Sequence, residues 1–255
     1  MPVVQDAVPE TSEPRSESIH SAERELLNSP RACALIATLA AVALVFWRAW
    51  TCDDAYITFR FVDNLLNGYG PVFYPGERVQ GYTHPLWFLL LALGGTVLPL
   101  HAWAITLSLL CTALTFWTLG TWLSNASTRP ERRGPAMLAL AFVVFALLSS
   151  STSVDFQTSG LECCLTHLLI VLLVVCVLPI DPGRRASPVI LLVLCGLLIL
   201  NRFDRAVVCG PVMLLAFVRL LQARRAREIG LALLAVSPLI AWLAFALIYY
   251  GSPFP

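Results

Sequence analysis

Long apolar segments dominate this chain of 255 residues and limit the folds open to it. Hydrophobic residues make up 58% of the sequence and charged residues 13%, whereas soluble domains carry about 25% charged residues. Lipid is the solvent that suits such a composition, which predicts an all-α polytopic transmembrane helix bundle of about seven to eight hydrophobic segments. The segments are Ala32–Trp50, Leu86–Leu98, Ala102–Leu123, Pro135–Leu148, Leu161–Ile180, Pro188–Leu200, Ala206–Leu221 and Ile229–Tyr250.

The remaining sequence predicts two domains and an orientation. Residues 1–31 are rich in Ser, Glu, Pro and Arg and contain no apolar run, so we expect a disordered cytoplasmic tail before a transmembrane module at 32–255. Arginines cluster at 129–134, 183–185 and 224–227, and basic loops favour the cytoplasmic side. This assignment places the N-terminus inside and the loop after the first segment outside.

The short segment Leu86–Leu98 decides whether that orientation is consistent. At ~1.5 Å per residue it is well short of a ~30 Å hydrocarbon core. If it crosses the membrane, the basic loop at 129–134 lies outside, against the rule. If it is re-entrant or interfacial, that loop lies inside, and we expect the second arrangement.

One polar stretch, Thr51–Trp87, interrupts the apolar segments just after the first of them. Helical periodicity across it predicts an amphipathic helix that lies in the membrane interface and ends at Asn67-Gly68. The polar arc of this helix holds Asp53, Tyr56, Arg60, Asp63, Asn64 and Asn67, and the opposite arc holds Ala55, Phe59, Val62 and Leu66.

The adjacent Asp53 and Asp54 at the start of that helix have two interpretations. One is a helix cap with a solvated neighbour, because carboxylates are favourable at helix N-termini. The other is a carboxylate that binds a divalent cation or takes a proton from an acceptor hydroxyl. Asp54 lies off the polar arc, so the two carboxylates point in different directions.

The stretch DDAYITFRFVDNLLNGYGPVFYPGERVQGYTHPLW resembles the first extracytoplasmic loop of GT-C glycosyltransferases. It is most similar to the branch containing arabinofuranosyltransferases that use a polyprenyl-phosphate sugar. TSGLE at 158–162, Arg202-Phe203-Asp204 and YYGSPFP at 249–255 fit the same branch. Departures are Gln80 for Glu, His84 for Asn and Phe203 for Pro. Since family members continue past YYG.P.P, we expect this chain to match only their N-terminal portion.

The resemblance implies which residues carry the chemistry. GT-C enzymes transfer sugars from lipid-linked phosphates, which needs a base for the acceptor hydroxyl and cations for the departing phosphate. Asp53 and Asp54 are the implied catalytic residues, with Asp53 ranked first as base, and the same pair could bind a divalent cation, Mg²⁺ or Mn²⁺. The implied donor phosphate ligands are Arg60, Arg78 and Arg202, and the candidate acceptor or substrate contacts are Tyr56, Glu162 and Asp204.

Each of these charged residues also has a structural interpretation. Arg78 could pair with Glu77 or Asp63, and Arg202 could pair with Asp204. Glu162 begins an apolar run, where a carboxylate is costly unless it is paired or faces a wet cavity.

Other polar residues are expected to serve packing rather than chemistry. His84, His101 and His167 show no ligand spacing and suit packing or interface positions. Tyr82, Trp87 and Trp103 are expected at the membrane interface. The eight cysteines show no metal-ligand spacing with histidines, and most lie in apolar runs as small buried hydrophobes.

The leading hypothesis is a glycosyltransferase that moves a sugar from a polyprenyl-phosphate donor to a cell-envelope glycan or lipid acceptor. It would act at the outer face of a bacterial plasma membrane. The alternatives are a non-catalytic lipid-sugar carrier or assembly partner, and an inactive fragment. A net charge of +1 argues against a nucleic-acid partner.

Overall fold

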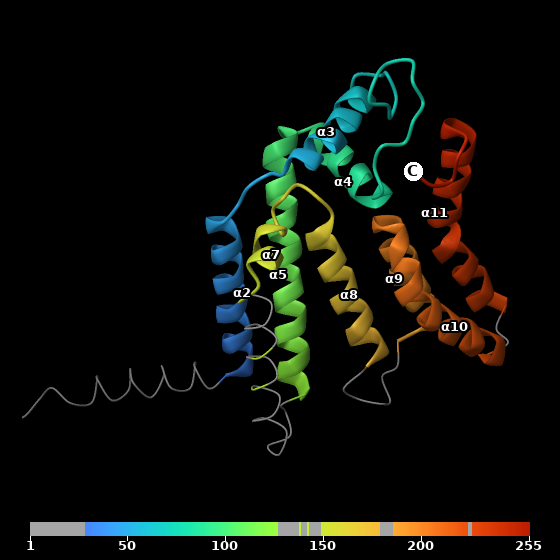
Figure 1. Cartoon of the computed structure of the whole chain (residues 1–255). Coiled ribbons are helices and arrows are strands. Elements are labelled where there is room, and N and C mark those ends of the chain that lie inside the picture. Colours follow the sequence, from blue (N-terminus) through green and yellow to red (C-terminus); the bar gives the residue numbers. More distant parts are fainter. Residues whose placement is uncertain (1–28, 127–137, 139–141, 143–148, 179–185, 224–225) are drawn as a thin grey trace, which may run out of the picture.

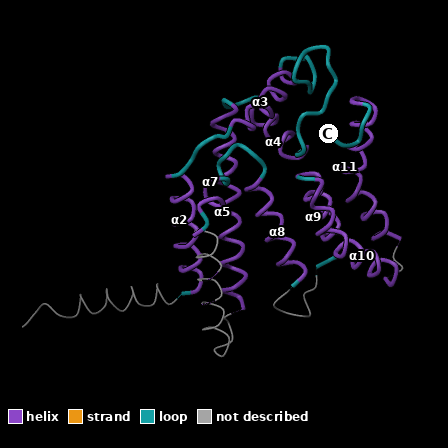
Figure 2. The backbone as a smooth tube through the Cα atoms, viewed as in Figure 1, coloured by secondary structure: helices purple, strands orange, loops and turns teal. Residues whose placement is uncertain are grey.

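The computed structural model describes residues 29–126, 138, 142, 149–178, 186–223 and 226–255. All regular structure within these residues is helical, as the sequence predicts, and they include no strand (Figures 1 and 2). The elements are α2 (Pro30–Trp47), α3 (Asp53–Leu66), α4 (Pro85–Gly95), α5 (Leu100–Ala126), α7 (Ser151–Asp155), α8 (Cys163–Val177), α9 (Pro188–Asn201), η1 (Phe203–Arg205), α10 (Ala206–Ala223) and α11 (Ala226–Tyr250).

Most predicted apolar segments coincide with helices, although several ends differ by a few residues. The first helix begins at Pro30, two residues before the expected start, because proline suits the first helical turn. The predicted segment Pro135–Leu148 lies outside the described residues except at positions 138 and 142. So do residues 1–28 of the predicted tail and the arginine clusters at 129–134 and 183–185.

The long helices stand side by side in the order α2, α5, α8, α9, with α10 and α11 packed on α9 (Figure 1). Many of their large apolar side chains face outward, including Leu214, Phe217 and Leu233. Two helices are long and apolar enough to cross a membrane, Leu100–Asn125 and Arg227–Tyr250. Four shorter apolar helices accompany them. An exterior this apolar suits a surface covered by lipid or protein.

Helix α4 begins and ends at the same end of the bundle. His84, just before α4, contacts Glu162 beside the start of α8. His101, just after the start of α5, lies 2.9 Å from the Thr51 hydroxyl, which precedes α3. Helix α4 therefore does not traverse the bundle, in agreement with the non-crossing arrangement expected for Leu86–Leu98.

Helix α3 is amphipathic and stops where the sequence predicts, because Asn67 caps it and Gly68 follows at φ +83°. Two residues depart from the predicted arcs. Asn64, placed on the polar arc, is 2% exposed, whereas Leu66, placed on the apolar arc, is 41% exposed. The helical wheel fails here because it omits the loop at 67–84, which folds back over α3.

Asn64 holds that returning loop. Its amide nitrogen donates hydrogen bonds to the carbonyl oxygens of Val72 and Phe73 at 2.8 and 2.9 Å. The apolar environment makes these bonds costly to lose, because carbonyl groups left without donors would have no water to replace them. A polar residue on this helix thus performs a structural task inside the protein.

Aromatic side chains attach the same loop to the end of α11. The Tyr250 hydroxyl donates to the Pro71 carbonyl oxygen at 2.7 Å and lies 3.2 Å from the Tyr82 hydroxyl. Tyr82 also stacks on Phe88. The prediction that Tyr82 and Trp87 sit at an interface is wrong, since they are 2% and 0% exposed. Each is buried because its polar atom finds a partner inside the protein.

Candidate functional site

The first turn of α3 presents two exposed carboxylates. Helix α3 begins at Asp53, directly after Cys52, and both Asp53 and Asp54 lie in its first turn. The Asp53 carboxylate accepts a hydrogen bond from the Asp54 backbone N–H at 3.1 Å. That bond and the helix dipole stabilise the negative charges there. Both carboxylates remain open to solvent, but neither is the predicted cap, because Cys52 occupies the N-cap position and no side chain caps the helix there.

The loop at 156–162 packs directly against this turn. The Cys52 N–H donates to the Ser159 carbonyl oxygen at 2.9 Å, and the Trp87 indole donates to the Gly160 carbonyl oxygen at 2.8 Å. Gly160 has φ +87°, and a Cβ there would lie 2.6 Å from the Ala55 Cβ. Only glycine combines this backbone conformation with so close an approach. The loop consequently brings Glu162 next to the start of α3.

Glu162 is buried and paired at the start of α8. Its side chain is 4% exposed, with one carboxylate oxygen 3.2 Å from His84 Nδ1 and the other 3.1 Å from Arg202 Nη1. Its backbone carbonyl accepts hydrogen bonds from Asn201 and Thr166, both at 3.2 Å. The expectation that a carboxylate here must be paired is confirmed.

Arg202 links this buried carboxylate to the surface. Its Nε donates to Asp204 at 3.1 Å while Nη1 donates to Glu162, and Arg205 lies 3.6 Å from Asp204. The Arg202 side chain is 43% exposed. Its expected pairing with Asp204 is confirmed, so one guanidinium bridges two carboxylates. Two arginines and two carboxylates balance in charge.

His84 completes the network from the other side. Its Nε2 lies 2.9 Å from the Thr58 hydroxyl, and its side chain is 7% exposed. Burial lowers the pKa of His84, and the opposing attraction of Glu162 does not cancel that effect. A neutral ring then donates from Nδ1 to Glu162 and accepts at Nε2 from Thr58. The prediction that His84 is a packing residue is incomplete, because its polar partners are distant in sequence.

The hydroxyl–imidazole–carboxylate order of Thr58, His84 and Glu162 is also that of a nucleophile relay. Thr58 is 1% exposed, so substrate does not reach its hydroxyl. The geometry therefore supports positioning by these three residues rather than nucleophilic attack by Thr58.

The other predicted site residues lie outside this network. Arg60 forms an ion pair with Asp63 at 3.5 Å. Arg78 stacks over the Tyr249 ring, 4.8 Å from its centroid, and no ion pair with Glu77 or Asp63 is found among the described residues. Stacking on the aromatic face leaves a guanidinium edge free for hydrogen bonds. Tyr56 is exposed on α3.

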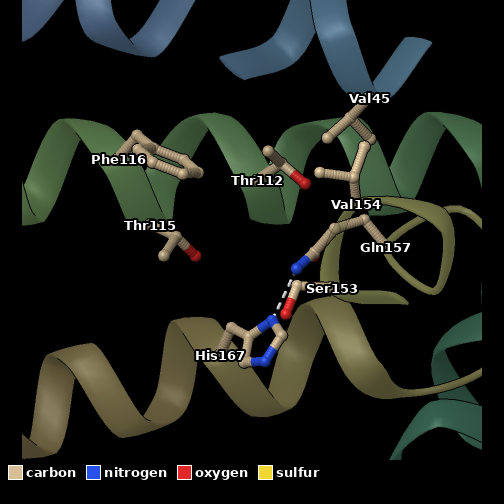
Figure 3. Close-up of a pocket in the computed structure, with 8 residues that line it drawn as sticks. All are labelled: Val45, Thr112, Thr115, Phe116, Ser153, Val154, Gln157 and His167. Atoms are coloured by element: carbon tan, nitrogen blue, oxygen red, sulfur yellow. Dashed lines mark hydrogen bonds between the residues drawn. The ribbon is translucent and has the colours of Figure 1, made fainter. Parts of the chain in front are cut away.

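A small cavity lies deeper in the bundle, between α2, α5, α7 and α8 (Figure 3). Gln157 and His167 form a hydrogen bond at its edge, and Thr112 and Thr115 line it from α5. Its volume of about 20 Å³ accommodates a water molecule and excludes a sugar ring. A sugar substrate therefore does not fit in this cavity.

The described residues contain no group of three or more His, Cys, Asp or Glu side chains that could hold a metal ion. Asp53 and Asp54 offer two exposed carboxylates, and a Mg²⁺ or Mn²⁺ ion there would complete its coordination with water and substrate oxygens. The donor set thus fits a cation shared with substrate and does not form an all-protein cage.

Within the described residues these features define a helical and largely apolar bundle that has Asp53, Asp54, Glu162, Arg202 and Asp204 at one of its ends. Such a division suits a membrane protein that handles a charged ligand at the membrane surface. Comparison with known proteins gives a more specific result.

Half of the chain is similar in sequence to terminal β-(1→2)-arabinofuranosyltransferases. The Mycobacterium tuberculosis enzyme is 38% identical over 135 residues, which are 49% of this chain and 21% of that protein. The Corynebacterium glutamicum enzyme is 37% identical over 131 residues, or 50% of this chain and 19% of that protein. The resemblance to arabinofuranosyltransferases inferred from the motifs is confirmed. The chain spans about a fifth of the length of these curated relatives.

No family model matches the chain. No solved structure matches it. The sequence similarity to the two transferases and the geometry of the polar end therefore carry the functional argument.

Proposed function

We propose that this chain is the donor-handling part of a GT-C type glycosyltransferase that transfers a sugar from a polyprenyl-phosphate to a cell-envelope glycan or lipid. The names of the similar proteins support arabinofuranose as the sugar. The reaction takes place at the outer face of a bacterial plasma membrane, in which the chain is a multi-pass protein with a cytoplasmic N-terminus.

One observation carries this proposal. A sequence match at 37–38% identity to named sugar transferases accompanies a structure that leaves Asp53 and Asp54 exposed beside the partly exposed Arg202, which pairs with the buried Glu162. Free carboxylates and a partly exposed guanidinium are the groups that glycosyl transfer from a phosphate requires, one to accept a proton and one to bind the leaving group.

The contacts support separate roles for the exposed carboxylates of Asp53 and Asp54 and for the side chains around the buried carboxylate of Glu162. Asp53 acts as base toward the acceptor hydroxyl, and the Asp53 and Asp54 carboxylates would hold a divalent cation, Mg²⁺ or Mn²⁺. Arg202 binds the donor phosphate, with Arg60 and Arg78 as the further cations of this end. Tyr56 and Asp204 are the remaining candidates for contact with substrate, whereas Glu162, which is 4% exposed, holds His84 and Arg202 instead.

The test is sugar transfer from a labelled polyprenyl-phosphate sugar by the chain reconstituted in membranes. Loss of a general base lowers rates by roughly 10²–10⁴-fold, and we expect a decrease of that size for Asp53→Asn. Glu77→Gln is the matched control, because Glu77 is an exposed carboxylate of the same polar stretch, Thr51–Trp87. Undiminished transfer by a folded Asp53→Asn protein would refute the role of Asp53.

A lipid-sugar carrier is the second candidate function, favoured by the strongly apolar exterior of α10 and α11. A carrier binds the same donor without turnover. Donor binding without transfer by the wild-type chain, with Mg²⁺ or Mn²⁺ and acceptor supplied, would select the carrier over the transferase.

A further inference from the structure

A continuous series of polar contacts runs from the interior of α3 to the exposed side of Arg202. It begins at the Thr58 hydroxyl, 2.9 Å from His84 Nε2, and continues from His84 Nδ1 to Glu162 at 3.2 Å. Glu162 then contacts Arg202 Nη1 at 3.1 Å. We propose that His84 is a positioning residue that orients the Arg202 guanidinium for the donor phosphate through Glu162. This inference rests on the proposed function, because it assumes that Arg202 binds phosphate.

The contacts remove the rotational freedom of the Glu162 carboxylate. His84 holds one of its oxygens, and the helix start is fixed by hydrogen bonds from Asn201 and Thr166 to the Glu162 carbonyl. The other carboxylate oxygen is consequently at a set position for Arg202. A charge-assisted hydrogen bond is directional, so a fixed acceptor fixes its donor.

A second carboxylate sets the plane of the same guanidinium. Asp204 accepts from Arg202 Nε at 3.1 Å while Glu162 accepts from Nη1. Two acceptors on two nitrogens of a planar group determine its orientation. Within the described part of the chain the hydrogen bonds of Arg202 use Nε and Nη1, which leaves Nη2 for a ligand. The 43% exposure of the side chain gives an anion access to it.

The neutral form of His84 suits this role better than the cation. A neutral ring donates one hydrogen bond to Glu162 and leaves the full negative charge of the carboxylate to attract Arg202. A cationic ring would compete with Arg202 for the same carboxylate. Glu162, Arg202 and the ring of Tyr82 are the charged or titratable groups facing His84, and burial lowers the pKa of the histidine despite Glu162.

Substitution at His84 separates positioning from simple packing. Alanine removes the donor to Glu162. Asparagine retains an N–H near the position of Nδ1, so it restores the contact that matters here while losing most of the ring. A packing role predicts that both variants bind weakly, because neither asparagine nor alanine replaces the volume of the ring. His101→Ala is the control, since His101 is a histidine of the same end of the bundle that contacts Thr51 instead.

The measurement is the binding of sugar-free polyprenyl phosphate to the full chain in lipid nanodiscs. We expect Arg202→Ala to bind at least tenfold more weakly than wild type, and His84→Ala to bind about tenfold more weakly. His84→Asn is expected within about threefold of wild type, and His101→Ala unchanged. Thermal unfolding of each variant identifies the folded fraction, and His84→Asn provides the comparison if His84→Ala folds poorly.

The outcomes separate the inference from the proposed function. If Arg202→Ala weakens binding while folded His84→Ala binds as wild type does, the positioning role is overturned and phosphate binding by Arg202 stands. If His84→Asn binds as weakly as His84→Ala, the hydrogen bond to Glu162 is not what matters and the inference is overturned. If wild type fails to bind the lipid phosphate, the proposed function fails and the inference fails with it.

Discussion

Substitution of Arg202 should destabilise the protein much more than substitution of Glu162, because the two members of this ion pair differ in burial. The Glu162 side chain is 4% exposed and that of Arg202 is 43% exposed. Arg202→Met removes the only arginine that contacts Glu162 among the described residues and leaves a buried charge with a neutral histidine. Glu162→Gln instead leaves a half-exposed guanidinium that keeps Asp204 and can turn toward water.

The burial values translate into different free energies of unfolding. An uncompensated buried charge costs about 3–5 kcal/mol. We expect Arg202→Met to lower the free energy of unfolding by ~3 kcal/mol, at the low end of this range, since His84 still donates a hydrogen bond to the carboxylate. For Glu162→Gln we expect ~1 kcal/mol, because a hydrated arginine loses little when an acceptor is removed. The double variant should cost ~2 kcal/mol less than the sum of the single variants.

Denaturant titration of the micelle-solubilised protein, followed by far-UV circular dichroism, measures these differences. His101→Ala serves as the reference for a substitution at the same end of the bundle. An equal or larger cost for Glu162→Gln than for Arg202→Met would refute the argument, because it would mean that Arg202 does not compensate the charge of the buried carboxylate. So would strict additivity in the double variant.

Three further predictions follow from buried contacts at the same end. His84 binds a proton more readily when unfolded, since burial lowers its folded pKa, so stability should fall as pH drops below ~6.5, by at most ~1.4 kcal/mol per pH unit. Denaturant titration from pH 7.5 to 5 checks this, and His84→Asn should lessen the slope. Gly160→Ala should cost about 2–4 kcal/mol by thermal unfolding, and Gly76→Ala less, because Gly160 combines positive φ with a neighbouring Cβ whereas Gly76 has positive φ and open space around it. Asn64→Ala should cost about 1–3 kcal/mol and speed proteolysis of the loop at 67–84, whereas unchanged cleavage would show that Asn64 does not hold it.

Sequence patterns among neighbouring residues were sufficient to predict the helices that position the site. The acidic start and the Asn67-Gly68 stop predicted the ends of α3, because caps and turns depend on adjacent residues. The length of Leu86–Leu98 predicted that α4 does not traverse the bundle. The motifs of the polar stretch predicted the resemblance to arabinofuranosyltransferases, which the comparisons confirm.

Contacts between distant residues were not predictable in this way. Glu162 meets Arg202 across 40 positions, and Tyr82 meets Tyr250 across 168. A helical wheel treats Asn64 as a solvated side chain because it represents one helix without the loop that covers it. The sequence indicated that Glu162 needs a partner, but nothing in the local pattern distinguished His84 and Arg202 from other candidates.

The resulting contacts divide the acidic residues of the polar end into two groups. Glu162 and Asp204 already accept hydrogen bonds from arginines, so a proton or a metal ion would have to displace a guanidinium to reach them. Asp53 and Asp54 pair with no arginine among the described residues and face solvent at a helix N-terminus. Carboxylates of the first group can orient cations, whereas those of the second group can accept a proton or bind a metal. A transferase needs both functions close together, and the packing of the loop at 156–162 against α3 supplies that proximity.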